Sequence, residues 1–249
     1  MTGTGEVMPE KRDKQQRLGT TLDNLKARWG EAALRLPGSG AEQTAVASVS
    51  TGFPALDRAL GIGGVPRGHL TLLQGVPTSG AGTLALKIAA SPTGAGEPVA
   101  YIDLAGTFDA DYAARCGVDL ERLVVVQIAA LSDALDILPV LFPAVGDIIL
   151  DPALPPDIPS PDRFTMRRLL ALLHRSPCAL VALGRGGMEG LSEQAALRLD
   201  ITRERWLKRR GDVRGYRVRV RVTRSRFGPA GGEVSLTIGF GGAVKGDGV

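Results

Sequence analysis

The chain has 249 residues, of which 44% are hydrophobic and 22% are charged. This is the composition of an ordinary globular protein with one large domain, or one domain and a small appendage. Its formal net charge of +4 permits an anionic partner without requiring one. The polar N-terminus lacks the apolar segment of a signal peptide. No apolar run approaches the about 18 residues of a membrane-spanning helix, so we expect a cytoplasmic protein with no membrane association.

The first 44 residues differ in character from the rest. Residues 1–10 are polar and are predicted to be disordered. Over residues 11–36 hydrophobic residues recur every three or four positions, which predicts an amphipathic helix. These residues are Leu18, Leu22, Leu25, Trp29, Ala33 and Leu36. Residues 37–45 read as a linker rich in Gly and Pro, so we divide the chain into residues 1–44 and a core domain, 45–249. The pattern leaves open whether the helix packs on its own domain or on a neighbouring subunit.

The core region alternates between aliphatic runs and amphipathic segments. Strands are predicted at residues 69–75, 98–104, 123–129, 147–151 and 178–184. Helices are predicted at residues 83–90, 108–117, 132–145 and 163–176, the third of them closed by its prolines. This alternation is typical of an α/β domain with a mainly parallel central sheet flanked by helices.

The last third of the chain has a different pattern. Residues 198–227 and 233–240 alternate apolar and polar side chains, and the turn signals RRGD and FGPAGG interrupt them. Such alternation predicts antiparallel β-strands. The expected fold is therefore an α/β core with antiparallel strands at its C-terminal end and a helix before it.

The stretch QGVPTSGAGTLALK, residues 74–87, joins a predicted strand to a predicted helix. Gly75 and Gly80 have the spacing of a phosphate-binding loop, GxxxxGK[ST]. The Lys of such a loop contacts phosphates and its Ser or Thr holds Mg²⁺, but this sequence has Ala81 and Gly82 there. The stretch is either a phosphate-binding loop without its chemistry or a glycine-rich structural turn.

The aliphatic run DIILD ends in Asp151. A carboxylate at the end of a buried strand beside a phosphate site can orient water on a metal ion. The alternative interpretation is that Asp151 caps the turn that follows. Because the loop lacks the hydroxyl that would share the metal, we expect no metal site.

Basic residues gather in the C-terminal third. In YRVRVRV the arginines alternate with valines, which places the arginines on one face of a strand. Residues 201–228 carry eleven cations and two carboxylates. A solvated outer face explains part of this excess, but repulsion between neighbouring strands favours an anionic partner such as nucleic-acid phosphate. The predicted DNA- or anion-binding face consists of Arg209, Arg210, Arg217, Arg219 and Arg221.

Other reactive side chains carry no site pattern. Cys116 and Cys178 are far apart and predict two buried thiols rather than a disulfide. His69 and His174 have no ligand spacing and are expected to be structural. Ser79 has no His or Asp arrangement near it that would make it a nucleophile.

Residues 50–75, STGFPALDRALGIGGVPRGHLTLLQG, resemble the segment before the P-loop in the RecA recombinase family. Residues 101–123 resemble the strand and helix that follow the loop, and residues 196–227 resemble the closing β-strands. The resemblance implies a RecA-type ATPase core, preceded by a helix that docks on the adjacent protomer to build filaments. Residues 14–36 match that helix in position, which favours packing between subunits and a homo-oligomer.

The same resemblance shows which family residues are missing. The P-loop Lys and Ser/Thr correspond to Ala81 and Gly82, and the catalytic Glu to Ala105. The polar residue that senses the γ-phosphate falls near Arg185. The two DNA-binding loops are shortened, and the C-terminal regulatory domain has no counterpart. We therefore expect no catalytic residue and no required cofactor, with weak ATP or ADP binding as the most that the loop supports.

Other family positions are retained. Asp151 corresponds to the Walker B Asp, and Asp109 and Tyr112 match positions that contact adenine. Arg224 and Arg226 match basic residues that reach across the subunit interface to the neighbour's nucleotide. The resemblance implies a vestigial nucleotide site formed by Gly75, Ser79, Gly80, Ala81, Gly82, Thr83, Asp109, Tyr112 and Asp151.

These observations predict a pseudo-ATPase in DNA repair, recombination or damage-induced mutagenesis (the SOS response), similar in size and truncation to ImuA-type RecA-like proteins. Its candidate partners are single-stranded DNA, and RecA or a translesion polymerase subunit. Two alternatives stay open. One is an active DNA-dependent ATPase with an atypical P-loop, whose charge comes from elsewhere, for example Lys87 or Arg185. The other is a purely structural oligomer or a subunit that caps RecA filaments.

Overall fold

The fold is described from a computed structural model, in which contacts separate the chain into two units, Met1–Thr44 and Ala45–Val249. The residues that the structure describes are 17, 19–21, 23, 24, 28, 46–104, 106–152, 162–184, 189–240 and 244–246. In the first unit these residues are helical, and the Thr21 hydroxyl donates to the Arg17 carbonyl at 2.8 Å. The predicted disordered start and the leucine-rich stripe lie outside the described residues.

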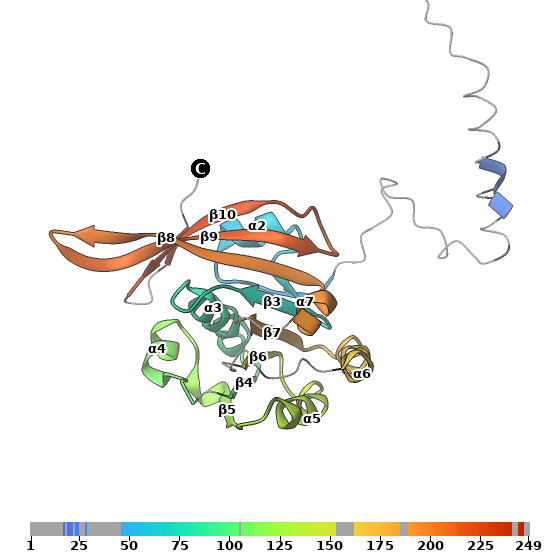
Figure 1. The fold of residues 1–249 in the computed structure, drawn as a ribbon, viewed down its shortest axis with the longest axis horizontal. Coiled ribbons are helices and arrows are strands. Elements are labelled where there is room, and N and C mark those ends of the chain that lie inside the picture. Colours follow the sequence, from blue (N-terminus) through green and yellow to red (C-terminus); the bar gives the residue numbers. More distant parts are fainter. Residues whose placement is uncertain are drawn as a thin grey trace, which may run out of the picture. The chain divides into compact units, whose positions relative to one another are not determined.

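The second unit is built on a nine-stranded sheet with the order β11-β10-β9-β8-β3-β7-β6-β4-β5 (Figure 1). The strands from β8 to β5 in this order pair in parallel, and β8, β9, β10 and β11 pair in antiparallel fashion. Their bounds are β3 Leu70–Gln74, β4 Val99–Asp103, β5 Leu123–Gln127, β6 Asp147–Asp151, β7 Ala179–Gly184, β8 Leu197–Arg209, β9 Asp212–Ser225, β10 Glu233–Gly239 and β11 Val244–Gly246. This arrangement confirms the predicted fold class.

Helices cover the parallel part of the sheet on both faces. The bounds are α2 Pro54–Leu60, α3 Ala81–Gly94, α4 Ala110–Arg115, α5 Leu131–Leu141, α6 Arg163–Leu173 and α7 Glu189–Gln194, with a 3-10 turn at Leu120–Arg122. One core cluster joins α2, α3 and α4 to the sheet, and a second joins α5, α6 and α7 to its other face. Because both faces are covered, β6 and β7 are buried along their whole length, which explains their unbroken aliphatic sequences.

The prediction that prolines close the third core helix was wrong in part. Pro139 lies inside α5, which continues to Leu141, and Pro143 follows the helix end. A proline removes one backbone hydrogen bond, but α5 buries Leu131, Ala134, Leu135 and Leu138 against the core. That packing holds the helix through the interruption.

The segment before the glycine loop forms a compact polar cluster. The Asp57 carboxylate accepts hydrogen bonds from the Ser50 hydroxyl at 2.6 Å and from the Thr51 hydroxyl and backbone N–H at 2.6 and 2.8 Å. A two-stranded ladder of β1 (Ser48–Val49) and β2 (Val65–Pro66) closes the segment. Gly64, at φ 153°, passes so close to the Val49 carbonyl that a Cβ would collide with it. The STGFPALD and GIGG motifs therefore fix the approach of the chain to β3.

The cysteines and histidines match their predicted structural roles. Cys116 and Cys178 are buried free thiols. The His69 ring packs edge-on against His174 at 4.9 Å and against Phe227 at 4.9 Å. These contacts tie the start of β3 to the end of α6, so both histidines belong to the packing.

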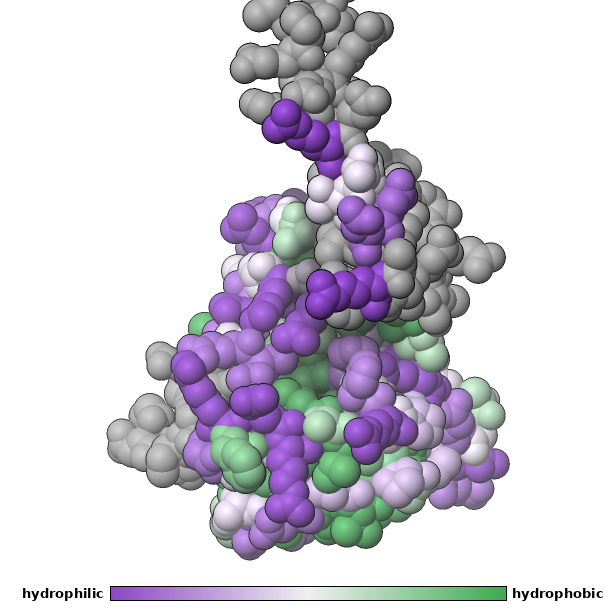
Figure 2. Space-filling view, turned by 90° about the vertical axis from the view of Figure 1, so that its right-hand side faces the viewer, coloured by the Kyte–Doolittle hydropathy of each residue, from purple (hydrophilic) through white to green (hydrophobic). Residues whose placement is uncertain are grey.

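None of the helices in the described part of the chain has the length and apolarity of a membrane span. Figure 2 shows one face of the molecule, on which hydrophilic side chains predominate and hydrophobic ones form patches between them.

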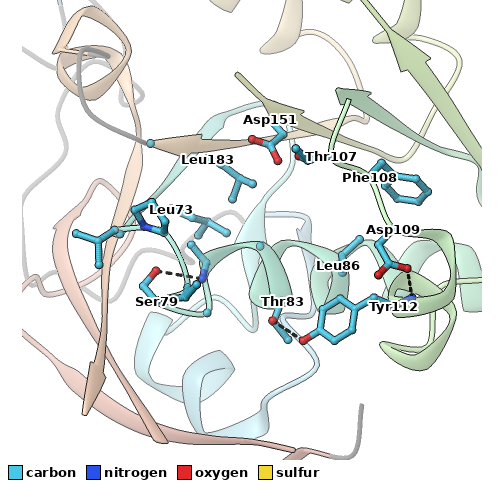
Figure 3. A pocket seen from close by; sticks show the side chains of 18 of the residues that line it. Leu73, Ser79, Thr83, Leu86, Thr107, Phe108, Asp109, Tyr112, Asp151 and Leu183 are labelled. Carbon is cyan, nitrogen blue, oxygen red and sulfur yellow. Dashed lines mark hydrogen bonds between the residues drawn. The ribbon is translucent and has the colours of Figure 1, made fainter. Parts of the chain in front are cut away.

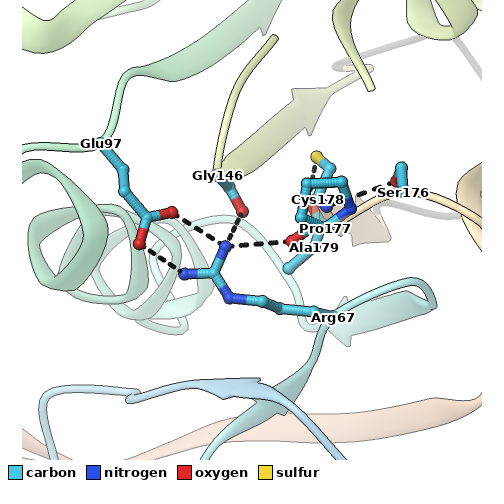
Figure 4. Close-up of polar contacts among 7 residues, drawn as sticks. All are labelled: Arg67, Glu97, Gly146, Ser176, Pro177, Cys178 and Ala179. Atoms are coloured by element: carbon cyan, nitrogen blue, oxygen red, sulfur yellow. Dashed lines mark hydrogen bonds and ion pairs between the residues drawn. The ribbon is translucent and has the colours of Figure 1, made fainter. Parts of the chain in front are cut away.

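The N-terminal edge of the parallel strands carries a second polar cluster (Figure 4). The Arg67 guanidinium pairs with Glu97 at 2.9 Å and donates to the carbonyls of Gly146 and Pro177 at 3.1 and 3.0 Å. Beside it, Asp147 at the start of β6 is fully buried. Neither carboxylate oxygen of Asp147 has a hydrogen bond of acceptable geometry within the described structure. No pattern in the sequence predicted this buried carboxyl group.

Candidate functional site

A cavity of about 240 Å³ opens at the carboxyl ends of β3, β4, β6 and β7 (Figure 3), where ligands bind in open α/β sheets. All nine residues of the predicted nucleotide site line it. They are Gly75, Ser79, Gly80, Ala81, Gly82, Thr83, Asp109, Tyr112 and Asp151. Sequence reasoning therefore located residues that meet at one site, although they span 77 positions of the chain.

The glycine loop keeps the backbone form that its spacing predicts. Gly80 has φ 104° and precedes the first residue of α3. A Cβ on Gly75 would collide with the Ser79 hydroxyl, and one on Gly80 would lie 3.0 Å from Val218 and 3.2 Å from Tyr216. Both glycines are therefore needed for packing whether or not a ligand binds, and the glycine spacing alone does not distinguish the two interpretations of the loop.

Gly80 and Gly82 provide a matched pair of substitutions. We expect Gly80→Ala to lower the free energy of unfolding by about 1–3 kcal/mol, because alanine is strained at positive φ and its Cβ crowds the core. Gly82→Ala meets no atom within 4 Å and removes a glycine from a helix, so it should be neutral or stabilising by up to about 1 kcal/mol. Urea denaturation measures both, and equal effects would contradict this account of the loop.

A cation from β8 holds the tip of the glycine loop. Arg203 donates to the Thr78 carbonyl at 3.2 Å and to the Thr78 hydroxyl at 2.9 Å. Thr78 has φ 64°, a conformation that costs a non-glycine residue energy. The Arg203 guanidinium also lies over the Trp206 ring, 4.3 Å from its centroid. Arg203 is one of the eleven cations of residues 201–228, and nothing in the local sequence pattern predicted its contact with the loop.

Three hydroxyl groups meet on the floor of the cavity. The Thr83 hydroxyl lies 2.7 Å from that of Tyr112 and 3.2 Å from that of Tyr216. Burial raises the pKa of Tyr112 to about 12, and its bond to Thr83 opposes the shift, so the phenol stays protonated near neutral pH. Asp109 accepts from the backbone N–H of Tyr112 at 2.8 Å and caps α4. Asp109 and Tyr112 thus have a local structural role in addition to any contact with a ligand.

The carboxylate of Asp151 is buried at the end of β6, and it accepts a hydrogen bond from the Tyr101 hydroxyl at 2.9 Å. The Tyr101 ring packs against Phe108 at 4.8 Å. Asp103, on the neighbouring strand, accepts from the backbone N–H groups of Thr107 and Phe108 at 3.2 and 2.9 Å. The aromatic rings of Tyr101 and Phe108 and the hydrogen-bonded carboxylate of Asp151 therefore line the side of the cavity opposite the loop, and Asp103 supports this side from behind the lining.

The described residues of the lining do not include the side chains that hold a magnesium–triphosphate in loops of this type. Among its described residues the charged groups are Asp109 and Asp151, both acidic. The Ser79 hydroxyl faces back to the Ala81 N–H at 3.4 Å, and Thr83 is engaged by two tyrosines. The volume is below the about 300 Å³ of typical ligand pockets. These residues fit a triphosphate poorly, because no described side chain balances its charge.

Lys87, one candidate for the missing positive charge, does not line the cavity. Its side chain packs beside Gly52 and near Cys116. The other candidate, Arg185, lies outside the described residues. The same is true of Ala105, of residues 153–161, where the first DNA-binding loop belongs, and of residues 185–188 in the second.

The predicted basic face is present on the antiparallel strands. Val218, Val220 and Val222 are buried, while Arg219 and Arg221 are exposed on the opposite face of β9. Arg219 pairs with Glu204 at 2.7 Å, and Arg221 pairs with Glu233 at 3.6 Å. Glu233 comes from β10, outside the segment in which the charges were counted. Carboxylates of the protein itself therefore balance part of the charge that was expected to need an external anion.

The remaining predicted residues lie away from the cavity. Arg217 is half-buried on β9, Arg209 is the last residue of β8, and Arg210 lies in the turn between β8 and β9. Arg224 donates to the Glu193 carbonyl at 2.6 Å, and the Arg226 N–H donates to Ala196 at 3.0 Å. Arg224 and Arg226 thus lie near the start of β3, at the edge of the sheet opposite the cavity of the same chain.

Comparison with known proteins gives a consistent result. A model of the RecA N-terminal domain matches residues 16–154. The chain is 30% identical over 262 residues to protein RecA of Aquifex aeolicus, covering 92% of this chain and 76% of that protein. It is 31% identical over 269 residues to protein RecA of Rubrobacter xylanophilus, covering 95% and 78%. The crystal structure of the RadB recombinase is similar with a TM-score of 0.59 and 19% identity, covering 78% of this chain and 97% of RadB, which shows a shared fold.

Proposed function

The chain belongs to the RecA family, and we propose that it is a RecA-like protein of DNA repair, recombination or damage-induced mutagenesis that binds DNA and protein partners without hydrolysing ATP. The observation that carries this proposal is the retained glycine loop without the loop's cation or metal-binding hydroxyl. Gly80 keeps its left-handed backbone, whereas positions 81 and 82 are alanine and glycine. The scaffold of a nucleotide site persists while its charged chemistry does not.

The basic face supports the DNA-binding part of the proposal. Arg219 and Arg221 alternate with buried valines, so the outer face of β9 presents both side chains to solvent. Their ion pairs with Glu204 and Glu233 are exposed and therefore contribute little stability. A phosphate backbone can compete for these arginines, because guanidinium groups bind phosphate with two parallel hydrogen bonds.

Reversal of the two charges tests this role. We expect Arg219→Glu together with Arg221→Glu to weaken single-stranded DNA binding by about tenfold or more and to reduce the salt dependence, since each lost phosphate contact removes about 0.7 from the slope of log affinity against log salt. The measurement is a titration of labelled oligothymidylate at two salt concentrations. Arg115→Glu with Arg122→Glu, an equal charge change near α4, is the matched control.

One outcome of that titration and one outcome of an ATPase assay would contradict the proposal. The first is wild-type affinity for DNA in the Arg219 and Arg221 variant, which would remove the basic face from DNA binding. The second is DNA-stimulated ATP turnover by the wild-type chain that Asp151→Asn abolishes, which would establish the active ATPase instead.

We also propose that protomers associate, with residues 11–36 and the pair Arg224 and Arg226 contributing to contacts between subunits. The two arginines lie at the opposite end of β3 from their own cavity, so a neighbouring chain is the partner whose cavity they can reach. RecA and a translesion polymerase subunit are the protein partners that we propose.

A further inference from the structure

The hairpin of β8 and β9 extends past the neighbouring strands of the sheet (Figure 1). Strand β3 pairs with β8 as far as Asp200, and β10 pairs with β9 from Gly215 onward. Residues 203–214, here termed the hairpin arm, therefore project beyond the edge at which the cavity opens. The arm carries six cations and two carboxylates, so it is strongly basic.

An aromatic cluster lies at the base of the arm and consists of Trp206 of the arm, Tyr216 of β9 and Phe240, which follows β10. The Trp206 ring lies 5.7 Å from that of Tyr216 and 6.2 Å from that of Phe240. Trp206 is 45% exposed and Phe240 46% exposed, whereas Tyr216 is buried at 8%. Tyr216 thus anchors the cluster in the core, and the other two rings present apolar surface to solvent.

The aromatic cluster and the basic face lie on opposite sides of the sheet. Trp206 pairs directly with Tyr216, and Tyr216 points to the same side as the buried valines of β9. Arg219 and Arg221 point to the other side, because side chains alternate along a strand. The cluster is therefore a second surface, separate from the face proposed to bind DNA.

Arg203 joins this surface to the glycine loop. Its guanidinium covers part of the Trp206 ring and donates two hydrogen bonds to Thr78. The combination of Trp, Tyr and Arg, partly buried and surrounded by charged residues, is characteristic of the residues that dominate protein–protein binding. A partner bound at Trp206 would therefore contact the residue that holds the loop.

We propose that the aromatic cluster and the arm cations on the same side of β8, Arg203 and Lys208, form a docking surface for an acidic segment of a partner protein. An apolar or aromatic side chain of that segment packs on Trp206 and Phe240. Charge complementarity favours an acidic partner, and the exposed rings favour one with an apolar anchor. The proposal rests on the protein-binding part of the proposed function and not on its DNA-binding part.

The ring geometry favours a protein over a nucleic acid at this surface. Bases stack on open aromatic faces that follow one another along a groove. Here Trp206 meets Tyr216 at 73° and Phe240 at 47°, so the rings pack against one another instead of forming parallel platforms. Arg203 occupies one face of the indole. A cluster of this kind offers an apolar contact area with a basic rim.

The fluorescence of Trp206 tests the proposal in the 249-residue chain. The sequence has two tryptophans, so Trp29→Phe leaves Trp206 as the single reporter. We expect a random copolymer of glutamate and tyrosine to bind saturably and to shift the Trp206 emission to the blue. Polyglutamate of equal charge should bind about tenfold more weakly. Phe240→Ala in the Trp29→Phe background should lower the affinity for the copolymer about tenfold or more. Trp206→Ala, whose binding is measured by the anisotropy of the labelled copolymer, should lower this affinity by a similar factor.

Controls make each outcome decisive. Phe164→Ala removes an aromatic ring that is 77% exposed on α6 and should leave copolymer binding unchanged, and melting temperatures verify that every variant folds. Equal binding of the copolymer and polyglutamate, or wild-type affinity in both aromatic variants, would overturn the proposal. An emission shift with oligothymidylate that is lost in Phe240→Ala would show a base-stacking site instead. If the wild-type chain binds the copolymer but not single-stranded DNA, the DNA-binding part of the proposed function is contradicted, whereas the docking surface is supported.

Discussion

Replacing Ala81 by Lys and Gly82 by Thr is expected to raise the affinity for Mg²⁺–ATP by a factor of about 10²–10⁴. The two side chains restore charge-assisted contacts that contribute about 1.5–3 kcal/mol each, and about 1.4 kcal/mol corresponds to tenfold in affinity. Isothermal titration of the wild type and of the double variant measures the gain. We expect no comparable gain in turnover, because the position of the family's catalytic Glu is still Ala105.

The structure allows both substitutions. A Cβ at position 82 would meet no atom within 4 Å, and Ala81 lines the cavity at the start of α3. The backbone of the loop is held by contacts that neither change disturbs: Gly80 packs on Val218, and Arg203 binds Thr78. A lysine at position 81 would also enter a cavity whose described charges are the carboxylates of Asp109 and Asp151, which favour a cation.

The matched control is Ala81→Met with Gly82→Val, which adds similar volumes without the charge or the hydroxyl. If this pair binds Mg²⁺–ATP as well as the Lys and Thr pair, filled volume and not charge limits the wild type. Wild-type affinity equal to that of the Lys and Thr variant would contradict the proposal that the loop has lost its phosphate chemistry.

Local patterns in the sequence predicted the fold and the position of the site. Periodicity identified the strands and helices of the core from residue 69 onward except α7 and β11, because a sheet covered on both faces requires unbroken aliphatic strands. Residues 189–194, which form α7, were expected in the second DNA-binding loop. The spacing of Gly75 and Gly80, with Asp151 at the end of a buried strand, located the cavity. Parallel strands place their carboxyl ends at one edge, so residues distant in sequence were expected to meet there.

Features that depend on contacts between distant segments were not predicted. The bonds from Arg203 to Thr78 join residues 125 positions apart, and the pattern of eleven cations did not distinguish this arginine from the others. Glu233 balances the basic face from a strand that lay outside the segment where charges were counted. Pro139 was predicted to end its helix, but tertiary packing outweighs the lost hydrogen bond. Packing against distant residues cannot be recognised from the local sequence.

Asp147 gives the second large expected effect, a loss of stability as the pH rises. Burial raises the pKa of Asp147 from 3.8 to about 7. Between these values the folded chain keeps the proton and the unfolded chain releases it, so the free energy of unfolding falls as the pH rises from about 4 to about 7. The change amounts to up to about 4 kcal/mol. Denaturation by urea across this range measures it, and Asp147→Asn should remove this contribution and be the more stable protein at pH 8.

The surroundings of Asp147 explain why its charge is costly. The backbone N–H of Ile148 and the Arg67 guanidinium oppose the shift, but the two terminal nitrogens of Arg67 donate to Glu97 and to the carbonyls of Gly146 and Pro177. The neighbouring Cys178 shows the same environment, because burial and the nearby Asp147 carboxylate raise the pKa of its thiol. An ionised Asp147 therefore remains without a hydrogen-bonded cation in the described structure.

The contrasting control is Asp162→Asn. The carboxylate of Asp162 caps α6 through the N–H groups of Phe164 and Thr165 and the Thr165 hydroxyl, and these bonds lower its pKa. Its contribution has the opposite sign: it is present above the unfolded pKa and is lost as the pH falls. Parallel stability curves for the wild type and Asp147→Asn between pH 4 and 8 would show that water or Arg67 solvates the Asp147 carboxylate, and the buried-charge account of this edge of the sheet would then be wrong.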